Sequence, residues 1–287
     1  MPTIGLCAQL ACIWETTARN PGNAHRFRDF NDVSHVDFLA SAAAIAPILE
    51  NAPSRRVGET ILGAIQTTRE VVKSNTNLGI VLLLSPLAAV GECENMQAGL
   101  RAILDSLDVE DARHAYQAIR LAEPAGLGRV AEQDVHDEPT GTLLAVMGLA
   151  ADRDLIARQY ANGFQQVFGD AMTALRTGLE KSTTHEDALI YTHLAMLAQF
   201  PDSLIARKRG PAEATEAAAR AQKVLDAGWP GDPRPLAEFD NWLCSAGRGR
   251  NPGTTSDLVT ACLFVALREN IIRLPCASPW TSGCGHA

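Results

Sequence analysis

The chain has 287 residues and a formal net charge of −8, with 46% apolar, 20% charged and 5% aromatic residues. This composition is typical of a globular protein that can bury a large core. Binding to nucleic acid requires a basic face, and the longest basic run is Arg207-Lys208-Arg209, so no nucleic-acid partner is expected. Seven scattered cysteines without CxxC spacing predict free thiols and a cytoplasmic location. The apolar run from Leu78 to Val90 is too short to span a bilayer, so no membrane partner is expected.

The hydrophobic pattern is helical almost throughout, and no alternating run of β-branched residues predicts a sheet. We therefore predict an all-α fold, a single-domain multi-helical bundle of about a dozen helices over residues 1–274. A flexible tail rich in proline and glycine is expected over 275–287. In chain order, the expected helices are 3–18, 35–50, 57–73, 77–90, 96–106, 109–121, 140–150, 152–167, 171–180, 185–199, 212–227, 234–246 and 254–272.

The first of four polar segments runs from Asn20 to Asp37. Arg26 is suited to holding phosphate, while His35 and Asp37 offer a base or a metal ligand on one helical turn. A capping role explains Asp37 equally well, because Ser34-x-x-Asp37 is a relative of the capping box. In that alternative, His35 is a surface residue.

The second segment, Asn75-Thr76-Asn77-Leu78-Gly79, opens the apolar helix expected at 77–90. One of the two asparagines could simply cap that helix. However, a helix that is apolar on all sides must be buried, so its polar start points into the interior or a cleft. Backbone N–H groups and short side chains at such a start can hold phosphate or sugar, which makes Asn75 and Asn77 candidate ligands.

The third segment runs from Pro201 to Gly210, which we expect to be a loop or a short helix. It offers Asp202 as a metal-binding carboxylate and Arg207 and Lys208 as phosphate-binding cations. The alternative is a solvated, charged turn between two helices.

The fourth segment is Asn251-Pro252-Gly253-Thr254-Thr255-Ser256-Asp257-Leu258. Its glycine permits close approach of a ligand to the backbone, and Asn251 and Thr254 supply donors. Asp257 lies in a first helical turn, where an N-terminal cap is the simpler explanation. If the ligand is a phosphate ester, an acidic protein most easily tolerates it through a bound divalent cation with a few local basic residues.

In this order, the four segments resemble the motifs of the triphosphoribosyl-dephospho-CoA synthase family, which builds the prosthetic group of citrate lyase and malonate decarboxylase. The resemblance spans nearly the whole chain. The matching stretches are Pro21-Gly22 with Ser34-His35-Val36-Asp37, Asn75-Thr76-Asn77-Leu78-Gly79, Asp202-Ser203-Leu204 with Lys208-Arg209-Gly210, and Asn251 to Leu258.

The resemblance implies an all-α transferase that moves the triphosphoribosyl unit of ATP onto a hydroxyl of dephospho-CoA or a related cofactor precursor and expels adenine. Such a displacement passes through an oxocarbenium-like transition state, which needs carboxylates, a base and phosphate-binding cations. By resemblance, Asp37 and Asp202 are partners of Mg²⁺ or of the oxocarbenium ion, and His35 is a base or orienting group. Asp257, with Asn75, contacts ribose or the metal and its water. A further expectation is that Asp202→Ala abolishes turnover and leaves the melting temperature nearly unchanged.

Two departures define the alternatives. The family's His-Lys is replaced by Asn77-Leu78, and its Arg-Gly-Glu-Ala is replaced by Ala157-Arg158-Gln159-Tyr160. One alternative is therefore phosphoribosyl transfer from phosphoribosyl pyrophosphate in tetrahydromethanopterin-type cofactor synthesis. Another is a non-catalytic helical interaction protein whose polar segments are helix caps. The sequence leaves open the acceptor, the donor and whether the chain forms a homodimer.

Overall fold

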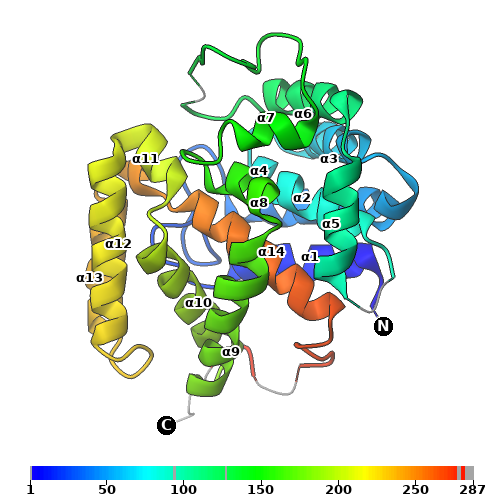
Figure 1. Cartoon of the computed structure of the whole chain (residues 1–287). Coiled ribbons are helices and arrows are strands. Elements are labelled where there is room, and N and C mark those ends of the chain that lie inside the picture. The colour runs from blue at the N-terminus through cyan, green and yellow to red at the C-terminus, as the bar shows by residue number, and fades with distance from the viewer. Residues whose placement is uncertain (1, 93–94, 127, 277–278, 282–287) are drawn as a thin grey trace.

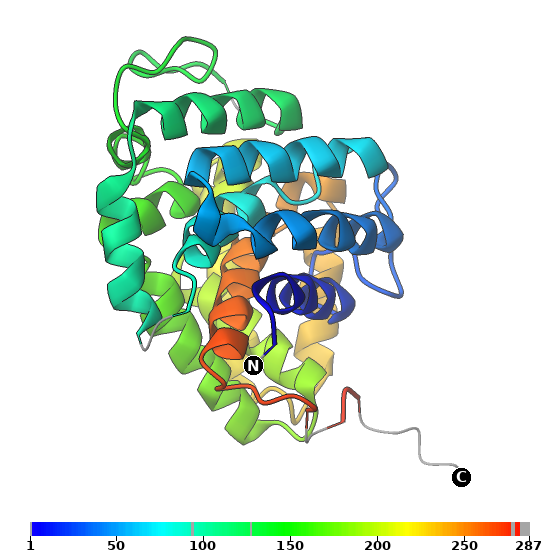
Figure 2. The same ribbon diagram turned by 90° about the vertical axis from the view of Figure 1, so that its right-hand side faces the viewer.

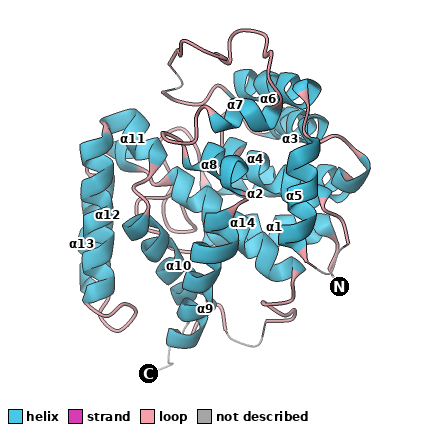
Figure 3. Ribbon diagram, in the orientation of Figure 1, coloured by secondary structure: helices cyan, strands magenta, loops and turns pink. Residues whose placement is uncertain are grey.

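The computed structural model describes residues 2–92, 95–126, 128–276 and 279–281. Within these ranges the chain folds into fourteen α-helices and no strand (Figures 1 and 3), which confirms the all-α prediction. The α-helices are α1 (Ile4–Thr17), α2 (His35–Glu50), α3 (Val57–Val71), α4 (Leu78–Ala89), α5 (Met96–Ser106), α6 (Val109–Ala122), α7 (Leu143–Gly148), α8 (Leu155–Asn162), α9 (Met172–Lys181), α10 (His185–Gln199), α11 (Ser203–Arg209), α12 (Pro211–Asp226), α13 (Arg234–Cys244) and α14 (Gly253–Arg268).

Two groups of helices flank a central pair, which consists of α4 and α14. On one side α1, α2, α3 and α6 stack one above the other (Figure 2), each packing against the next. On the other side α10 to α13 surround a smaller apolar cluster that includes Trp229 and Phe239. Between them, α14 contacts α1, α4 and α10, so it joins the two groups.

The central helices are buried because their sequences leave no polar face. In α4, the run from Ile80 to Ala88 is buried throughout. In α14, each residue from Thr254 to Leu267 is buried except Asp257. A helix that is apolar on all sides is stable only inside the protein. The polar start of each helix is therefore carried into the interior, as the sequence predicted for α4.

Helix ends differ from the prediction where the backbone turns left-handed. The helix expected at 152–167 stops at Asn162, because Gly163 adopts φ +70° and its N–H bonds the Gln159 carbonyl. A π-helical turn, Gln166–Ala171, then leads into α9. Similarly, α14 ends at Arg268 rather than at 272, and Ile271 donates its N–H back to the Ala266 carbonyl. Both ends satisfy carbonyls that would otherwise be left without donors.

Two other expectations are refined. The segment after Pro201 forms the short helix α11. The tail predicted over 275–287 lies partly outside the described residues, and in its described part the carbonyls of Pro279 and Trp280 accept hydrogen bonds from the first residues of α10. No helix of the described ranges is long and apolar enough to cross a membrane.

Candidate active site

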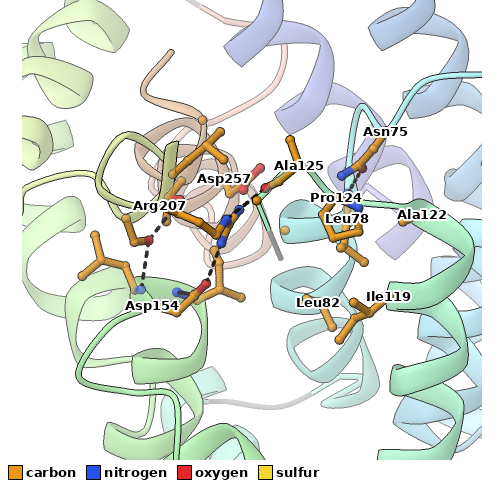
Figure 4. A pocket seen from close by; sticks show the side chains of 18 of the residues that line it. Asn75, Leu78, Leu82, Ile119, Ala122, Pro124, Ala125, Asp154, Arg207 and Asp257 are labelled. Carbon is orange, nitrogen blue, oxygen red and sulfur yellow. Dashed lines mark hydrogen bonds and ion pairs between the residues drawn. The ribbon is translucent and has the colours of Figure 1, made fainter. Parts of the chain in front are cut away.

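A cavity of about 1530 Å³ is lined by residues from the first turns of α4, α8, α11 and α14. Ligand pockets usually measure about 300–1,000 Å³, so this cavity has room for more than one substrate. One end of it is polar and the other apolar (Figure 4). It brings together seven of the residues predicted from sequence: Asn75, Asn77, Arg207, Lys208, Asn251, Thr254 and Asp257.

The start of α4 forms one wall. Asn75 caps the helix by accepting the Leu78 N–H at 3.1 Å. Asn77 is buried and donates to the Thr68 hydroxyl at 2.9 Å, which leaves its Oδ1 without a partner. The Thr76 hydroxyl bonds Ser41 of α2 at 2.6 Å. The asparagines therefore cap and anchor the helix while their side chains still line the cavity.

The start of α14 forms the facing wall. Asn251 donates to the carbonyl of Gly22 and to the side chain of Asn23, which fixes the N-terminal Pro-Gly turn against α14. Thr254 accepts a hydrogen bond from Ser203 at 3.1 Å. Asp257 faces the cavity, and no hydrogen bond joins its carboxylate to any described residue.

Close contact between the two walls depends on a glycine. A methyl group built on Gly79 would overlap the carboxylate of Asp257. Because any larger side chain at this position would displace that carboxylate, glycine allows α14 to approach the first turn of α4. The second and fourth polar segments of the sequence thus meet in direct contact.

The carboxylate of Asp257 sits in an unfavourable environment for a charge. Burial raises its pKa well above the ordinary value, and the neighbouring charges of Glu15, Asp202 and Asp154 raise it further. Arg207 opposes this shift. A carboxylate that is buried among other carboxylates gains most from a positively charged ligand.

Asp202 is placed differently from Asp257. It is fully buried, and its carboxylate accepts hydrogen bonds from the backbone N–H groups of Leu204, Ile205 and Thr255 and from the Thr255 hydroxyl. It is absent from the cavity lining. Asp202 therefore caps α11 and ties it to the start of α14, and its four hydrogen bonds leave little capacity for the predicted metal.

Two predicted cations from α11 enter the cavity. Arg207 bonds the carbonyl of Ala125 at 3.1 Å and the carboxylate of Asp154 at 3.2 Å (Figure 4). Lys208 donates only to the Arg248 carbonyl, at 3.2 Å, among the residues described. Burial lowers the pKa of Lys208, and the nearby charges of Arg248 and Arg207 add to this effect. Lys208 is thus a half-buried ammonium group that would gain from an anion.

Besides Asp202, three predicted residues lie outside the cavity lining: Arg26, His35 and Asp37. Arg26 forms a bidentate ion pair with the buried Glu186, at 2.6 and 2.9 Å. Asp37 closes a capping box with Ser34 at the start of α2. Burial lowers the pKa of His35, whose Nε2 has no partner. The structure thus gives Arg26 and Asp37 structural partners and separates all three from the residues that converge.

Three cavity residues were missed by the sequence analysis. Asp154 caps α8 and holds Arg207. Arg158 bonds only carbonyl oxygens, those of Ala151 and Asp152, among the described residues, so its charge is not neutralised by a carboxylate. Glu15, near the end of α1, is 7% exposed and lines the cavity. The departure from the family pattern at 157–160 marked the region of Arg158, but no motif marked Glu15.

The apolar end of the cavity lies between α4, α6 and α7. Leu78 and Leu82 of α4 face Ile119 and Ala122 of α6, with Pro124 nearby (Figure 4). Such a surface suits a planar ring or an alkyl chain rather than a phosphate.

Comparisons with known proteins agree on one family. The sequence profile described as ATP:dephospho-CoA triphosphoribosyl transferase matches residues 1–275. A solved structure from Archaeoglobus fulgidus, assigned as a triphosphoribosyl-dephospho-CoA synthase, superposes with a TM-score of 0.65 at 26% identity, covering 80% of this chain and 98% of that one. Among curated proteins, no relative matches.

Proposed function

The chain belongs to the ATP:dephospho-CoA triphosphoribosyl transferase family, a family of transferases, and from this premise we propose how its cavity works. The reaction moves the triphosphoribosyl unit of ATP to a hydroxyl of dephospho-CoA and releases adenine. The observation that carries the proposal is the convergence on one cavity of predicted site residues from three polar segments that are distant in the sequence. A scaffold whose polar segments were only helix caps would not need a shared cavity.

The phosphates would bind at the polar end. The helix dipole favours anions at a helix start, and α4 and α14 begin at this cavity. The start of α8 also lies here, but Ser203 and Asp154 already accept its first three N–H groups. Lys208 and Arg158 add two positive charges that carboxylates of the described residues do not neutralise. These charges can compensate for the family's lysine, which Leu78 replaces here.

Asp257 is the proposed partner of the reacting carbon. As the bond between ribose and adenine breaks, positive charge develops at C1′. A carboxylate in a poorly hydrated site stabilises that charge strongly when no basic side chain is paired with it. The carboxylate of Asp257 meets these conditions.

The described residues offer few side-chain ligands for Mg²⁺ at this site. No group of three or more metal-ligating side chains occurs among the described residues. Mg²⁺ is commonly held by one or two carboxylates together with substrate phosphates, and Asp257 is the member of the predicted set Asp37, Asp202 and Asp257 that faces the cavity. When bound, the ion would neutralise phosphate charge.

Adenine or the acceptor would occupy the apolar end, between Leu82 and Ile119.

A second donor, phosphoribosyl pyrophosphate, is favoured by one observation. The replacement of the family's lysine by Leu78 removes a cation that a triphosphate would use. This alternative would serve a tetrahydromethanopterin-type pathway.

The test is release of the leaving group from purified protein. With ATP, Mg²⁺ and dephospho-CoA, adenine and the triphosphoribosyl product should form in equal amounts, as measured by chromatography and mass spectrometry. Lys208→Met should raise the KM for ATP at least about tenfold, the effect of losing one charge-assisted contact worth about 1.4 kcal/mol. Lys223→Met, on the far end of α12, is the matched control and should behave like wild type. Pyrophosphate release from phosphoribosyl pyrophosphate, without adenine release from ATP, would reassign the donor.

A further inference from the structure

A second carboxylate shares the cavity wall with Asp257. Glu15 lies near the end of α1, which packs against α14, and it lines the cavity although it is only 7% exposed. It is close enough for its charge to be the largest electrostatic contribution that raises the pKa of Asp257. Among the described residues, neither carboxylate forms an ion pair with a basic side chain. Burying two such groups side by side costs stability, so they require an explanation.

Glu15 is held in a defined orientation. The side chain of Asn20, which is fully buried, donates to Glu15 Oε1 at 2.9 Å and to the Glu15 carbonyl at 3.2 Å. Ser256 of α14 lies near this carboxylate and lowers its pKa, while its hydroxyl accepts a hydrogen bond from Asn23. The turn after α1 therefore orients this carboxylate at the cavity wall.

A purely structural role does not account for this arrangement. Glu186 is equally buried, but it forms ion pairs with Arg19 and Arg26 and so joins α10 to the N-terminal loop. Glu15 neither caps a helix nor pairs with a cation in the described chain. What distinguishes Glu15 is its position in the cavity wall, near Asp257, the carboxylate assigned to C1′.

We propose that Glu15 is the catalytic residue that accepts the proton of the acceptor hydroxyl, an inference that rests on the proposed transfer reaction. The bond between C1′ and the adenine nitrogen breaks, and its electron pair leaves with adenine. The acceptor oxygen forms the new bond to C1′, and its proton passes to the Glu15 carboxylate. Glu15 then returns that proton to solvent, from which the departing adenine takes one.

The surroundings suit a base. Burial raises the pKa of Glu15 from its ordinary value, although Ser256 and Asn20 oppose the shift. A base is most effective when its pKa lies near the working pH. The titratable groups that share this wall are Asp257 of α14 and Cys12 of α1, with Asp202 beyond Asp257.

The first experiment compares Glu15→Gln with Glu186→Gln, an equally buried glutamate outside the cavity. In Glu15→Gln, kcat should fall by about 10²–10⁴-fold, the usual contribution of a general base. The acid-side rise of kcat/KM with pH should disappear, while the dissociation constant for ATP, from calorimetry, changes less than about threefold. Glu186→Gln should keep the wild-type pH profile and kcat per folded molecule. Glu15→Asp, which keeps the base, should retain the acid-side rise at reduced kcat.

Two results would overturn the proposal. An unchanged pH profile with kcat within about tenfold of wild type would show that Glu15 only supports the wall. Loss of Mn²⁺ binding in Glu15→Gln, measured by electron paramagnetic resonance, with the pH profile intact would make it a metal ligand.

A measurement on the free enzyme separates this inference from the proposed function. Carboxyl ¹³C NMR of glutamate-labelled protein should show one titration above the ordinary range that disappears in Glu15→Gln. An ordinary pKa for Glu15 would contradict the inference even in an active enzyme. If wild type released no adenine from ATP, the proposed donor would fail, and the Glu15→Gln comparison would be repeated on pyrophosphate release from phosphoribosyl pyrophosphate.

Discussion

The starts of α2 and α14 have the same local pattern but different environments. Ser34-x-x-Asp37 and Thr254-x-x-Asp257 both place a hydroxyl three residues before an aspartate. At α2 the two side chains close a capping box with each other. At α14, which begins at Gly253, Asp257 lies in the second turn rather than in the first turn expected from the sequence, so it cannot act as a cap. Asp202 of another helix accepts the Thr255 N–H instead. Capping from outside leaves a carboxylate available to the cavity, and sequence spacing alone does not reveal this difference.

The largest expected effect is a difference in activity between variants of Asp257 and Asp37. Asp257→Asn should reduce adenine release by about 10³-fold, the scale of losing one electrostatic stabiliser of the transition state. Its thermal unfolding temperature should stay equal or rise, because an unpaired, poorly hydrated charge is removed. Asp37→Asn should lose up to about 1 kcal/mol of unfolding free energy and keep near-wild-type kcat. Comparable activity losses in both variants would break the comparison.

Substitution of Asp202 should mainly reduce the free energy of unfolding. Asp202→Ala leaves the N–H groups of Leu204, Ile205 and Thr255 without acceptors, the last two of them buried, and each buried group without a partner costs about 1–3 kcal/mol. We therefore expect the free energy of unfolding to fall by at least about 3 kcal/mol in urea denaturation. This outcome is the opposite of the stable, inactive variant that the sequence pattern suggested. A variant with wild-type stability and no turnover would restore the metal-binding interpretation.

The contact between α4 and α14 can be disturbed by one methyl group. Gly79→Ala should displace the Asp257 carboxylate and reduce kcat by roughly 10–100-fold, the scale of a misplacement of about 1 Å. Gly63→Ala in α3 is the matched control, since the nearest atom to its added methyl group is Ile48 Cγ2 at an ordinary 3.6 Å. The control should gain up to about 1 kcal/mol of stability without loss of activity. Equal kcat for the two variants would show that the position of Asp257 is not critical.

A smaller expected effect is the pH dependence of the free energy of unfolding. Because the pKa of Asp257 is raised in the folded protein, its protonated form contributes stability at low pH that is lost as pH rises through the folded pKa. Asp257→Asn should therefore be more stable than wild type at neutral pH, and the difference should vanish near pH 4. Urea denaturation at several pH values measures the difference. A gap that is independent of pH would show that the carboxylate is not destabilised by its surroundings.

Most of the fold follows from local patterns. The helices starting at His35, Val57 and His185 begin where the periodicity placed them. The break after Asn162 was missed, because a left-handed glycine followed by a π-helical turn leaves no strong periodic signal. These local rules predict elements but not the contacts between them.

The cavity was predictable only in part. A helix as apolar as α4 had to carry Asn75 and Asn77 inward, and this placement follows from hydrophobicity. Whether Arg26 binds a phosphate or forms an ion pair with Glu186 depends on a contact between residues that lie 160 positions apart in the sequence. Glu15 stands outside any motif, since it reaches the cavity through the packing of α1 on α14. Such long-range partners are set by the tertiary structure.

The most direct test of the central claim is a crystal structure of Asp257→Asn with ATP and Mg²⁺. We predict phosphates at the starts of α4 and α14 within hydrogen-bond distance of Lys208, and ribose C1′ facing residue 257. A nucleotide bound outside this cavity, or phosphates held instead at Arg26 and His35, would contradict the account.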